Sequence, residues 1–245
     1  MSNSSLQNKV VVVAGASRGI GLEFVKQISA TNNVIFAGAR NPSQAKELQD
    51  LAKKCENVHP ITLDICDDDS IKKAVEEVSQ KAPQGIDVLI NTAGIAGPLD
   101  NATQTTREDY MSTFNTNVVS IARNISFFLP LLQKRGKDHV KKILNISSEF
   151  GSLHHRETSG ANNMAAYGVS KAALNMMTEI VANELKNDNF VVYLGHPGWV
   201  ATDMGGKDAA LQPQDSVRGL LKVLNDVTVK DNGKFYDWQG KEMKW

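Results

Sequence analysis

The chain has 245 residues, enough to bury a sizeable core in one large domain. Its 27 Lys plus Arg balance 27 Asp plus Glu, so no net charge draws it to nucleic acid or to an anionic membrane. Apolar runs are far shorter than a membrane span, the N-terminal residues are polar, and Cys55 and Cys66 lack metal-like or redox-motif spacing. We expect one domain over residues 1–245, a cytoplasmic location, no metal, and no nucleic-acid or membrane partner.

Short apolar runs alternate with helical patterns along the chain. The pattern predicts strands at 9–15, 33–39, 57–65, 85–94, 140–148 and 189–198, a further strand within 233–240, and helices at 19–31, 43–54 and 67–81. Such alternation is typical of a doubly wound α/β fold, a parallel sheet of about seven strands with helices on both faces, Rossmann-like. Ligands of this fold class bind beyond the carboxyl ends of the strands.

A glycine-rich turn, "GASRGIG", follows the first predicted strand. Gly15 permits a tight turn, Gly19 lets the backbone approach a phosphate, and Gly21 permits close packing of helix on strand. The amides at the start of the following helix favour an anion. The turn therefore predicts a dinucleotide site, with contacts from Gly15, Ser17, Arg18, Gly19, Ile20 and Gly21.

The stretch "AAYGVSKAALN", residues 165–175, places Tyr167 and Lys171 one helical turn apart on the same face. Small residues surround the pair, which leaves room for a flat ligand. An isolated pair of this kind is usually a partly buried Tyr beside a solvated Lys. A functional interpretation therefore needs support from other parts of the chain.

That support comes from an ordered set of motifs over nearly the whole chain, which resembles the short-chain dehydrogenase/reductase family. The matching positions are Asn91, Ala93 and Gly94 in "NTAG", Asn117 in "NTNVVS", Ser148 in "ISSEFG", Tyr167 and Lys171 in "YGVSK", and Pro197, Gly198 and Thr202 in "PGWVAT". "GHPGWVATDMGG" and "FYDWQGKEMKW" are similar to the carbonyl-reductase branch that includes the Sniffer and C-signal proteins. The chain departs from the family at Ala14 and Thr92, where hydrogen bonds that brace the turn are expected to change.

The resemblance implies a catalytic set of four residues. Tyr167 would exchange a proton with the substrate oxygen, Ser148 would bind and orient that oxygen, and Asn117 would hold a water that links Lys171 to solvent. Lys171 would hold the nicotinamide ribose, and its ammonium should lower the pKa of the neighbouring phenol. The resemblance also implies cofactor contacts at Asn91, Ala93, Gly94, Tyr167, Lys171, Pro197, Val200 and Thr202.

The cofactor preference depends on the end of the second predicted strand. An NAD site usually has an acid there, but this chain has Gly38, Ala39 and Arg40. Arg40, together with Arg18, could bind a 2′-phosphate, which favours NADP(H). Asp64 matches the family's adenine-binding Asp, although on its own it is as readily a turn or capping residue.

The leading function is therefore an NADPH-dependent carbonyl reductase that acts on a small ketone, aldehyde or diketone. Two alternatives stay open: an NAD-dependent alcohol dehydrogenase, and a dinucleotide-sensing signalling protein without useful turnover. The resemblance also implies a homodimer through the helices that carry Asn117 and Tyr167, which a long segment before Tyr167 can obstruct.

The interval between Ser148 and Tyr167 is longer than is usual in the family. The extra residues, 152–164, are expected to bulge over the substrate side, with His154 and His155 as surface residues. Leu153, Trp199 and Met204 are candidates for an apolar substrate wall, with ordinary packing as the alternative.

Overall fold

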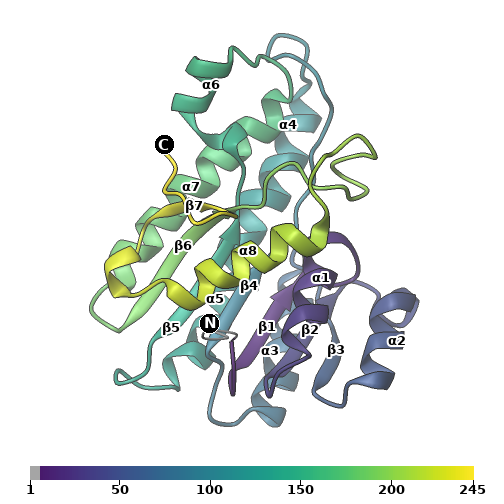
Figure 1. Ribbon diagram of the computed structural model, residues 1–245, viewed down its shortest axis with the longest axis vertical. Coiled ribbons are helices and arrows are strands. Elements are labelled where there is room, and N and C mark those ends of the chain that lie inside the picture. Colours follow the sequence, from purple (N-terminus) through teal and green to yellow (C-terminus); the bar gives the residue numbers. More distant parts are fainter. Residues whose placement is uncertain (1–5) are drawn as a thin grey trace.

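A computed structural model describes residues 6–245, in which seven strands form one parallel sheet (Figure 1). The sheet order is β3-β2-β1-β4-β5-β6-β7. The strands are β1 (Val10–Ala14), β2 (Val34–Ala39), β3 (Val58–Thr62), β4 (Val88–Asn91), β5 (Lys141–Ile146), β6 (Phe190–His196) and β7 (Phe235–Asp237). This order confirms the predicted doubly wound fold, including the short last strand.

Helices cover both faces of the sheet, and the alternation of side chains along the strands explains why. Val11 and Val13 of β1 belong to one buried cluster, with α1 (Gly19–Ile28), α2 (Lys46–Lys54) and α8 (Pro213–Asp226). Val12 and Ala14 belong to the other cluster, with α3 (Asp68–Lys81), α5 (Ser120–Gln133) and α7 (Ala165–Leu185). Strands that are buried on both faces are the norm in such sheets.

The strand order reverses between β1 and β4, whose carboxyl ends lie side by side, with Ala14 opposite Asn91. Ligands of open α/β sheets bind at this kind of switch point. Around this end of the molecule lie α4 (Arg107–Phe114), the π-helical turn η2 (Asn115–Val119) and the loop that precedes α8 (Figure 1). Three short 3-10 turns complete the chain: η1 (Pro42–Gln44), η3 (Glu149–Gly151) and η4 (Val229–Asp231).

The extra segment before Tyr167 folds as α6 (Leu153–Ser159) and a short loop, and its expected position over a substrate stays a prediction. The Ser152 hydroxyl caps the helix by accepting from the His155 amide at 3.0 Å, and Gly160 ends it in the left-handed conformation. Ser152 also donates to the carbonyl of Lys244 at 2.7 Å. The C-terminus therefore holds the start of α6.

Within residues 6–245 no helix combines the length and apolar character that a membrane span requires. The same residues contain no group of three His, Cys, Asp or Glu side chains arranged to hold a metal ion. The polar residues 1–5 lie outside the described part of the chain.

Candidate active site

The glycine turn between β1 and α1 has the shape of a phosphate cradle. Gly15 has a φ of +92°, and a Cβ there would lie 2.7 Å from the Ala93 amide nitrogen. A Cβ on Gly21 would lie 2.1 Å from the Gly15 carbonyl oxygen. Gly19, with φ of +56°, has only the Thr202 side chain near its Cβ position, at 3.5 Å. The turn is therefore packed tightly on its protein side and open at Gly19, which fits a dinucleotide phosphate.

Substituting Gly21→Ala tests this packing. The added methyl group would push α1 away from the Gly15 carbonyl, so we expect a loss of about 1–3 kcal/mol in unfolding free energy and a large loss of NADPH affinity. Thermal melting and a fluorescence titration would measure the two effects. Gly136→Ala is the control for affinity. Its φ of +79° means that an alanine there strains the backbone and lowers stability, but nothing lies within 4 Å of that Cβ position, so NADPH affinity should stay unchanged. Parent-like NADPH binding by Gly21→Ala would contradict the assignment.

Side chains at the end of β4 brace this turn. The Thr92 hydroxyl donates to the Ala14 carbonyl at 2.8 Å, so the departure from the family motif keeps a hydrogen bond to the turn. The Asn91 amide donates to Asn145 at 2.8 Å and accepts from Asn124 at 2.7 Å, and all three side chains are buried. Asn91 therefore braces β4 through its side chain, and its contact with a cofactor stays a prediction.

Ser148, Tyr167 and Lys171 come together at the carboxyl end of β5. Ser148 follows the strand, and its hydroxyl accepts from the Phe150 amide at 3.2 Å. Lys171 is buried in α7, where its ammonium donates to the Ile146 carbonyl at 2.8 Å and lies 5.6 Å from the centre of the Tyr167 ring. The fold thus assembles three of the four predicted catalytic side chains around one point.

Burial controls the protonation of this group. It raises the pKa of Tyr167, hydrogen bonding with the Ser148 hydroxyl opposes this rise, and the Glu149 carboxylate adds to it. Burial also lowers the pKa of Lys171 to about 8. The expectation that the pKa of Tyr167 is lowered is therefore wrong for this structure, because burial, the largest cause, raises this pKa. The phenol keeps its proton at neutral pH and can act as a proton donor.

Asn117 lies in the π-helical turn η2, a type of distortion that is frequent at functional sites. Its side-chain oxygen accepts from the Ile95 amide at 2.9 Å, and its nitrogen donates to the Ile95 carbonyl at 2.8 Å and to Ser170 at 3.0 Å. Asn117 therefore holds the chain that follows Gly94, beside the site. Its predicted contact with a water stays a prediction.

The loop that precedes α8 lies against the glycine turn. The Thr202 side chain packs near Gly19, and the Arg18 guanidinium lies 3.2 Å from the Asp203 carboxylate. Both members of this ion pair are exposed, so the pair contributes little and Arg18 can turn to another anion. Pro197 is held through its carbonyl, which accepts from Ser216 at 2.6 Å.

Two further cofactor candidates have contrasting surroundings. Arg40 is exposed at the end of β2 and forms no ion pair with any residue of 6–245. The Asp64 carboxylate accepts from the Cys66 amide at 3.0 Å, and the Asp64 amide donates to Ser70. Asp64 thus has the turn role that was its alternative interpretation, and its adenine contact stays a prediction.

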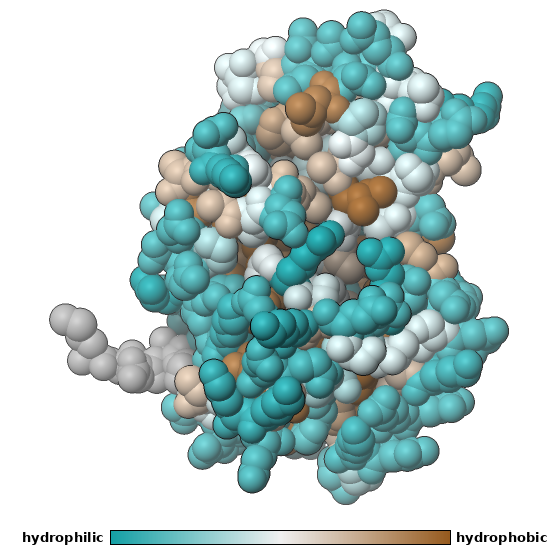
Figure 2. All heavy atoms as spheres, turned by 90° about the vertical axis from the view of Figure 1, so that its right-hand side faces the viewer, coloured by the Kyte–Doolittle hydropathy of each residue, from teal (hydrophilic) through white to brown (hydrophobic). Residues whose placement is uncertain are grey.

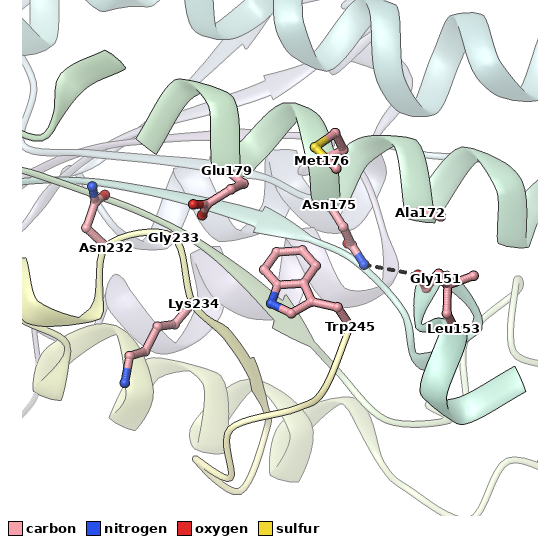
Figure 3. A pocket seen from close by; sticks show the side chains of 10 residues that line it. All are labelled: Gly151, Leu153, Ala172, Asn175, Met176, Glu179, Asn232, Gly233, Lys234 and Trp245. Carbon is pink, nitrogen blue, oxygen red and sulfur yellow. Dashed lines mark hydrogen bonds between the residues drawn. The ribbon is translucent and has the colours of Figure 1, made fainter. Parts of the chain in front are cut away.

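The candidates for a substrate wall do not lie together. The Trp199 indole donates to the Gly205 carbonyl at 2.7 Å and closes the loop that also carries Met204. Leu153 instead lines a separate cavity of about 450 Å³ between α7 and the C-terminal Trp245 (Figure 3). None of Ser148, Tyr167 and Lys171 lines this cavity, and Leu153 is largely exposed, so its place in a substrate wall stays a prediction.

Comparison with known proteins identifies the family of this chain and its fold. A family model described as short chain dehydrogenase matches residues 9–212, and the chain belongs to this family of NAD(P)-using oxidoreductases. The NADPH-bound carbonyl reductase from chicken fatty liver is 36% identical, with a TM-score of 0.92 over 98% of this chain and 100% of that chain. Carbonyl reductase Sniffer of D. melanogaster is 32% identical, with a TM-score of 0.91 over 98% and 100%.

A third relative is C-signal of Myxococcus xanthus. It is 39% identical over 160 residues, which cover 65% of this chain and 93% of C-signal. The resemblance to the family, and to Sniffer and C-signal within it, is confirmed.

Proposed function

We propose that the protein is an NADPH-dependent carbonyl reductase that converts a ketone, aldehyde or diketone into an alcohol. The observation that carries this proposal is the meeting of Ser148, Tyr167 and Lys171 beside the glycine turn, with the phenol protonated at neutral pH. The carbonyl reductases among the similar structures support it.

Each side chain has a defined role in the proposed reaction. When bound, NADPH supplies the hydride that is added to the carbonyl carbon. The Ser148 hydroxyl binds the carbonyl oxygen and orients it toward the phenol. Tyr167 gives its proton to that oxygen as negative charge develops there, which is general acid catalysis. The Lys171 ammonium holds the nicotinamide ribose and stabilises the phenolate that remains.

The direction of the reaction is supported by the same protonation states. A raised pKa keeps the Tyr167 phenol protonated at neutral pH, which is the form from which carbonyl reduction starts, whereas the alternative alcohol dehydrogenase starts from the phenolate. A protein that only senses a dinucleotide has no use for a proton donor next to the nicotinamide site. The carbonyl reductase therefore accounts for the protonated Tyr167 better than the alcohol dehydrogenase or the dinucleotide-sensing protein does.

The surface near the site favours an apolar substrate. On the face shown in Figure 2, several hydrophobic residues lie in the upper half among hydrophilic ones. The exposed apolar side chains at the carboxyl ends of the strands include Ile95, Leu99, Trp199 and Met204. Such a rim would desolvate the hydrocarbon part of a carbonyl compound.

A panel of carbonyl compounds tests the function directly. We expect the absorbance of NADPH to fall when apolar ketones or aldehydes are added. When NADH replaces NADPH in the same assay, the absorbance of NADH should fall little. Tight NADPH binding without turnover of any carbonyl would instead support the sensing alternative. Faster alcohol oxidation with NAD would support the dehydrogenase alternative.

The NADPH preference is tested by Arg40→Asp. A carboxylate at the end of β2 would repel a 2′-phosphate, and the guanidinium that could pair with this phosphate would be lost. We expect NADPH affinity to fall far more than NADH affinity in paired titrations. Arg218→Asp, on the exposed surface of α8, is the control for the change of charge. An unchanged ratio of the two affinities would exclude Arg40 and leave Arg18 as the candidate.

A further inference from the structure

The guanidinium of Arg156 connects both ends of the segment that separates Ser148 from Tyr167. Arg156 of α6 donates through Nε to the Phe150 carbonyl at 3.2 Å. Its Nη1 donates to the carbonyls of Ala161 at 3.1 Å and Asn163 at 2.9 Å, in the loop that leads into α7. Arg156 forms no salt bridge with any residue of 6–245, so its contacts are with main-chain oxygens.

Arg156 also packs directly on the helix that carries the proton donor. A Cβ placed on Gly168 would lie 2.2 Å from Nη2 of Arg156, so the guanidinium fills the space that the missing side chain leaves. Gly168 is the residue after Tyr167 in α7. Only a glycine at this position allows so close an approach.

Phe150 transmits this contact to both catalytic hydroxyl groups. The Arg156 guanidinium lies 4.5 Å above the Phe150 ring, and the same ring meets the Tyr167 ring edge-on with centres 6.3 Å apart. The Phe150 amide donates to the Ser148 hydroxyl at 3.2 Å. Phe150 is thus held by Arg156 through its carbonyl and its ring, and it contacts Ser148 and Tyr167 in turn.

We propose that Arg156 is a positioning residue, which acts through Phe150 to hold the hydroxyl groups of Ser148 and Tyr167 in the geometry that proton transfer to a carbonyl requires. The inference rests on the proposed function. It assigns the extra segment before Tyr167 a part in the reaction as the support of the proton donor. The glycine turn lies on other elements, so Arg156 should affect turnover and leave NADPH affinity unchanged.

Arg156→Ala and Arg156→Lys test the proposal. Misplacing a catalytic group by about 1 Å can cost on the order of 10²-fold in rate, so we expect Arg156→Ala to lower kcat by about 10- to 100-fold. The Kd for NADPH should match the parent. Arg156→Lys keeps the charge but loses the planar fork and the stacking, so it should also be impaired. Millimolar guanidinium chloride, compared with equal sodium chloride, should restore part of the kcat of Arg156→Ala.

Arg123→Ala is the matched control. The Arg123 guanidinium also stacks on a ring, at 4.7 Å from the centre of Phe127, but on the outer surface of α5, paired with Asp68. This variant should keep the parent kcat. Unchanged kcat in Arg156→Ala, an equal loss in Arg123→Ala, or no restoration by guanidinium would overturn the proposal.

Amide hydrogen exchange separates this proposal from the proposed function, because it needs no turnover. In Arg156→Ala the Phe150 amide should exchange faster than in the parent, while amides of β1 and α1 should not change. If the parent reduces no carbonyl, faster exchange at Phe150 still supports positioning by Arg156. Unchanged exchange at Phe150 overturns it whether or not the parent is active.

Discussion

Tyr167→Phe is expected to lower kcat for carbonyl reduction by about 10²–10⁴-fold, the usual contribution of a general acid. The substitution removes one hydroxyl and keeps the ring, so the edge-on contact with Phe150 should survive. Because the phenol holds its proton in the folded protein, the loss should be similar at all pH values up to neutral. Initial rates with NADPH and an active carbonyl, measured from acidic to neutral pH, would show it.

Two measurements accompany this substitution. NADPH affinity and the melting temperature should stay near those of the parent, because the hydroxyl takes part in binding the substrate oxygen and not in the core. Tyr193→Phe provides a control, since that phenol is buried in β6 away from the site and should not affect kcat. Turnover of Tyr167→Phe close to that of the parent would exclude Tyr167 as the proton donor.

The sequence predicted those parts of the site that depend on local structure. The glycine turn, the strand ends and the helix that carries Tyr167 and Lys171 follow from residue spacing, and the structure places them as expected. Ser148 could be placed at the site because the carboxyl ends of parallel strands share one edge of the sheet, whereas its pairing with Tyr167 of α7 followed from the family motifs. The family motifs then supplied the chemistry.

Features that depend on tertiary contacts were missed or misjudged. The direction of the pKa shift of Tyr167 depends on how much solvent the fold removes, which spacing does not reveal. The buried chain of Asn91, Asn124 and Asn145 joins three elements distant in sequence. The only sequence signal for it was the presence of amides within otherwise apolar segments. Nothing in the residue spacing pointed to Arg156, whose contacts appear only in the folded chain.

Lys171→Met separates the charge of this residue from its bulk. Methionine keeps most of the volume, so α7 should pack as before, but the ribose loses a charge-assisted donor and the phenolate loses its neighbouring cation. We expect weaker NADPH binding and a large loss of kcat at neutral pH.

The pH dependence of NADPH binding identifies the ammonium as the cause. With a pKa of about 8, Lys171 of the parent loses its proton as pH rises through that value, so the Kd for NADPH should increase there. In Lys171→Met the Kd for NADPH should be higher at every pH and should not increase near pH 8. If the Kd of the variant still increases near pH 8, a group other than Lys171 is responsible for the increase.

As pH rises above 8, deprotonation of Lys171 should weaken NADPH binding but make the folded protein more stable. Between about pH 8 and 10.5 the unfolded chain keeps the Lys171 proton while the folded protein has released it, so this residue makes the unfolding free energy rise with pH across that window. Below pH 8 the folded protein holds a buried charge at a cost on the order of 3 kcal/mol. Methionine removes that cost but leaves the Ile146 carbonyl without its donor, which costs about 1–3 kcal/mol.

Denaturant unfolding of the parent and Lys171→Met at pH 7 and pH 9.5 would measure this balance. At pH 7 the variant should be at least as stable as the parent, and its advantage should shrink at pH 9.5. A variant several kcal/mol less stable than the parent at pH 7 would show that Lys171 supports the fold. In that case its loss of activity could not be assigned to the missing charge. Equal or higher stability together with lost turnover would instead show that the protein keeps a buried ammonium for the reaction, at the expense of stability.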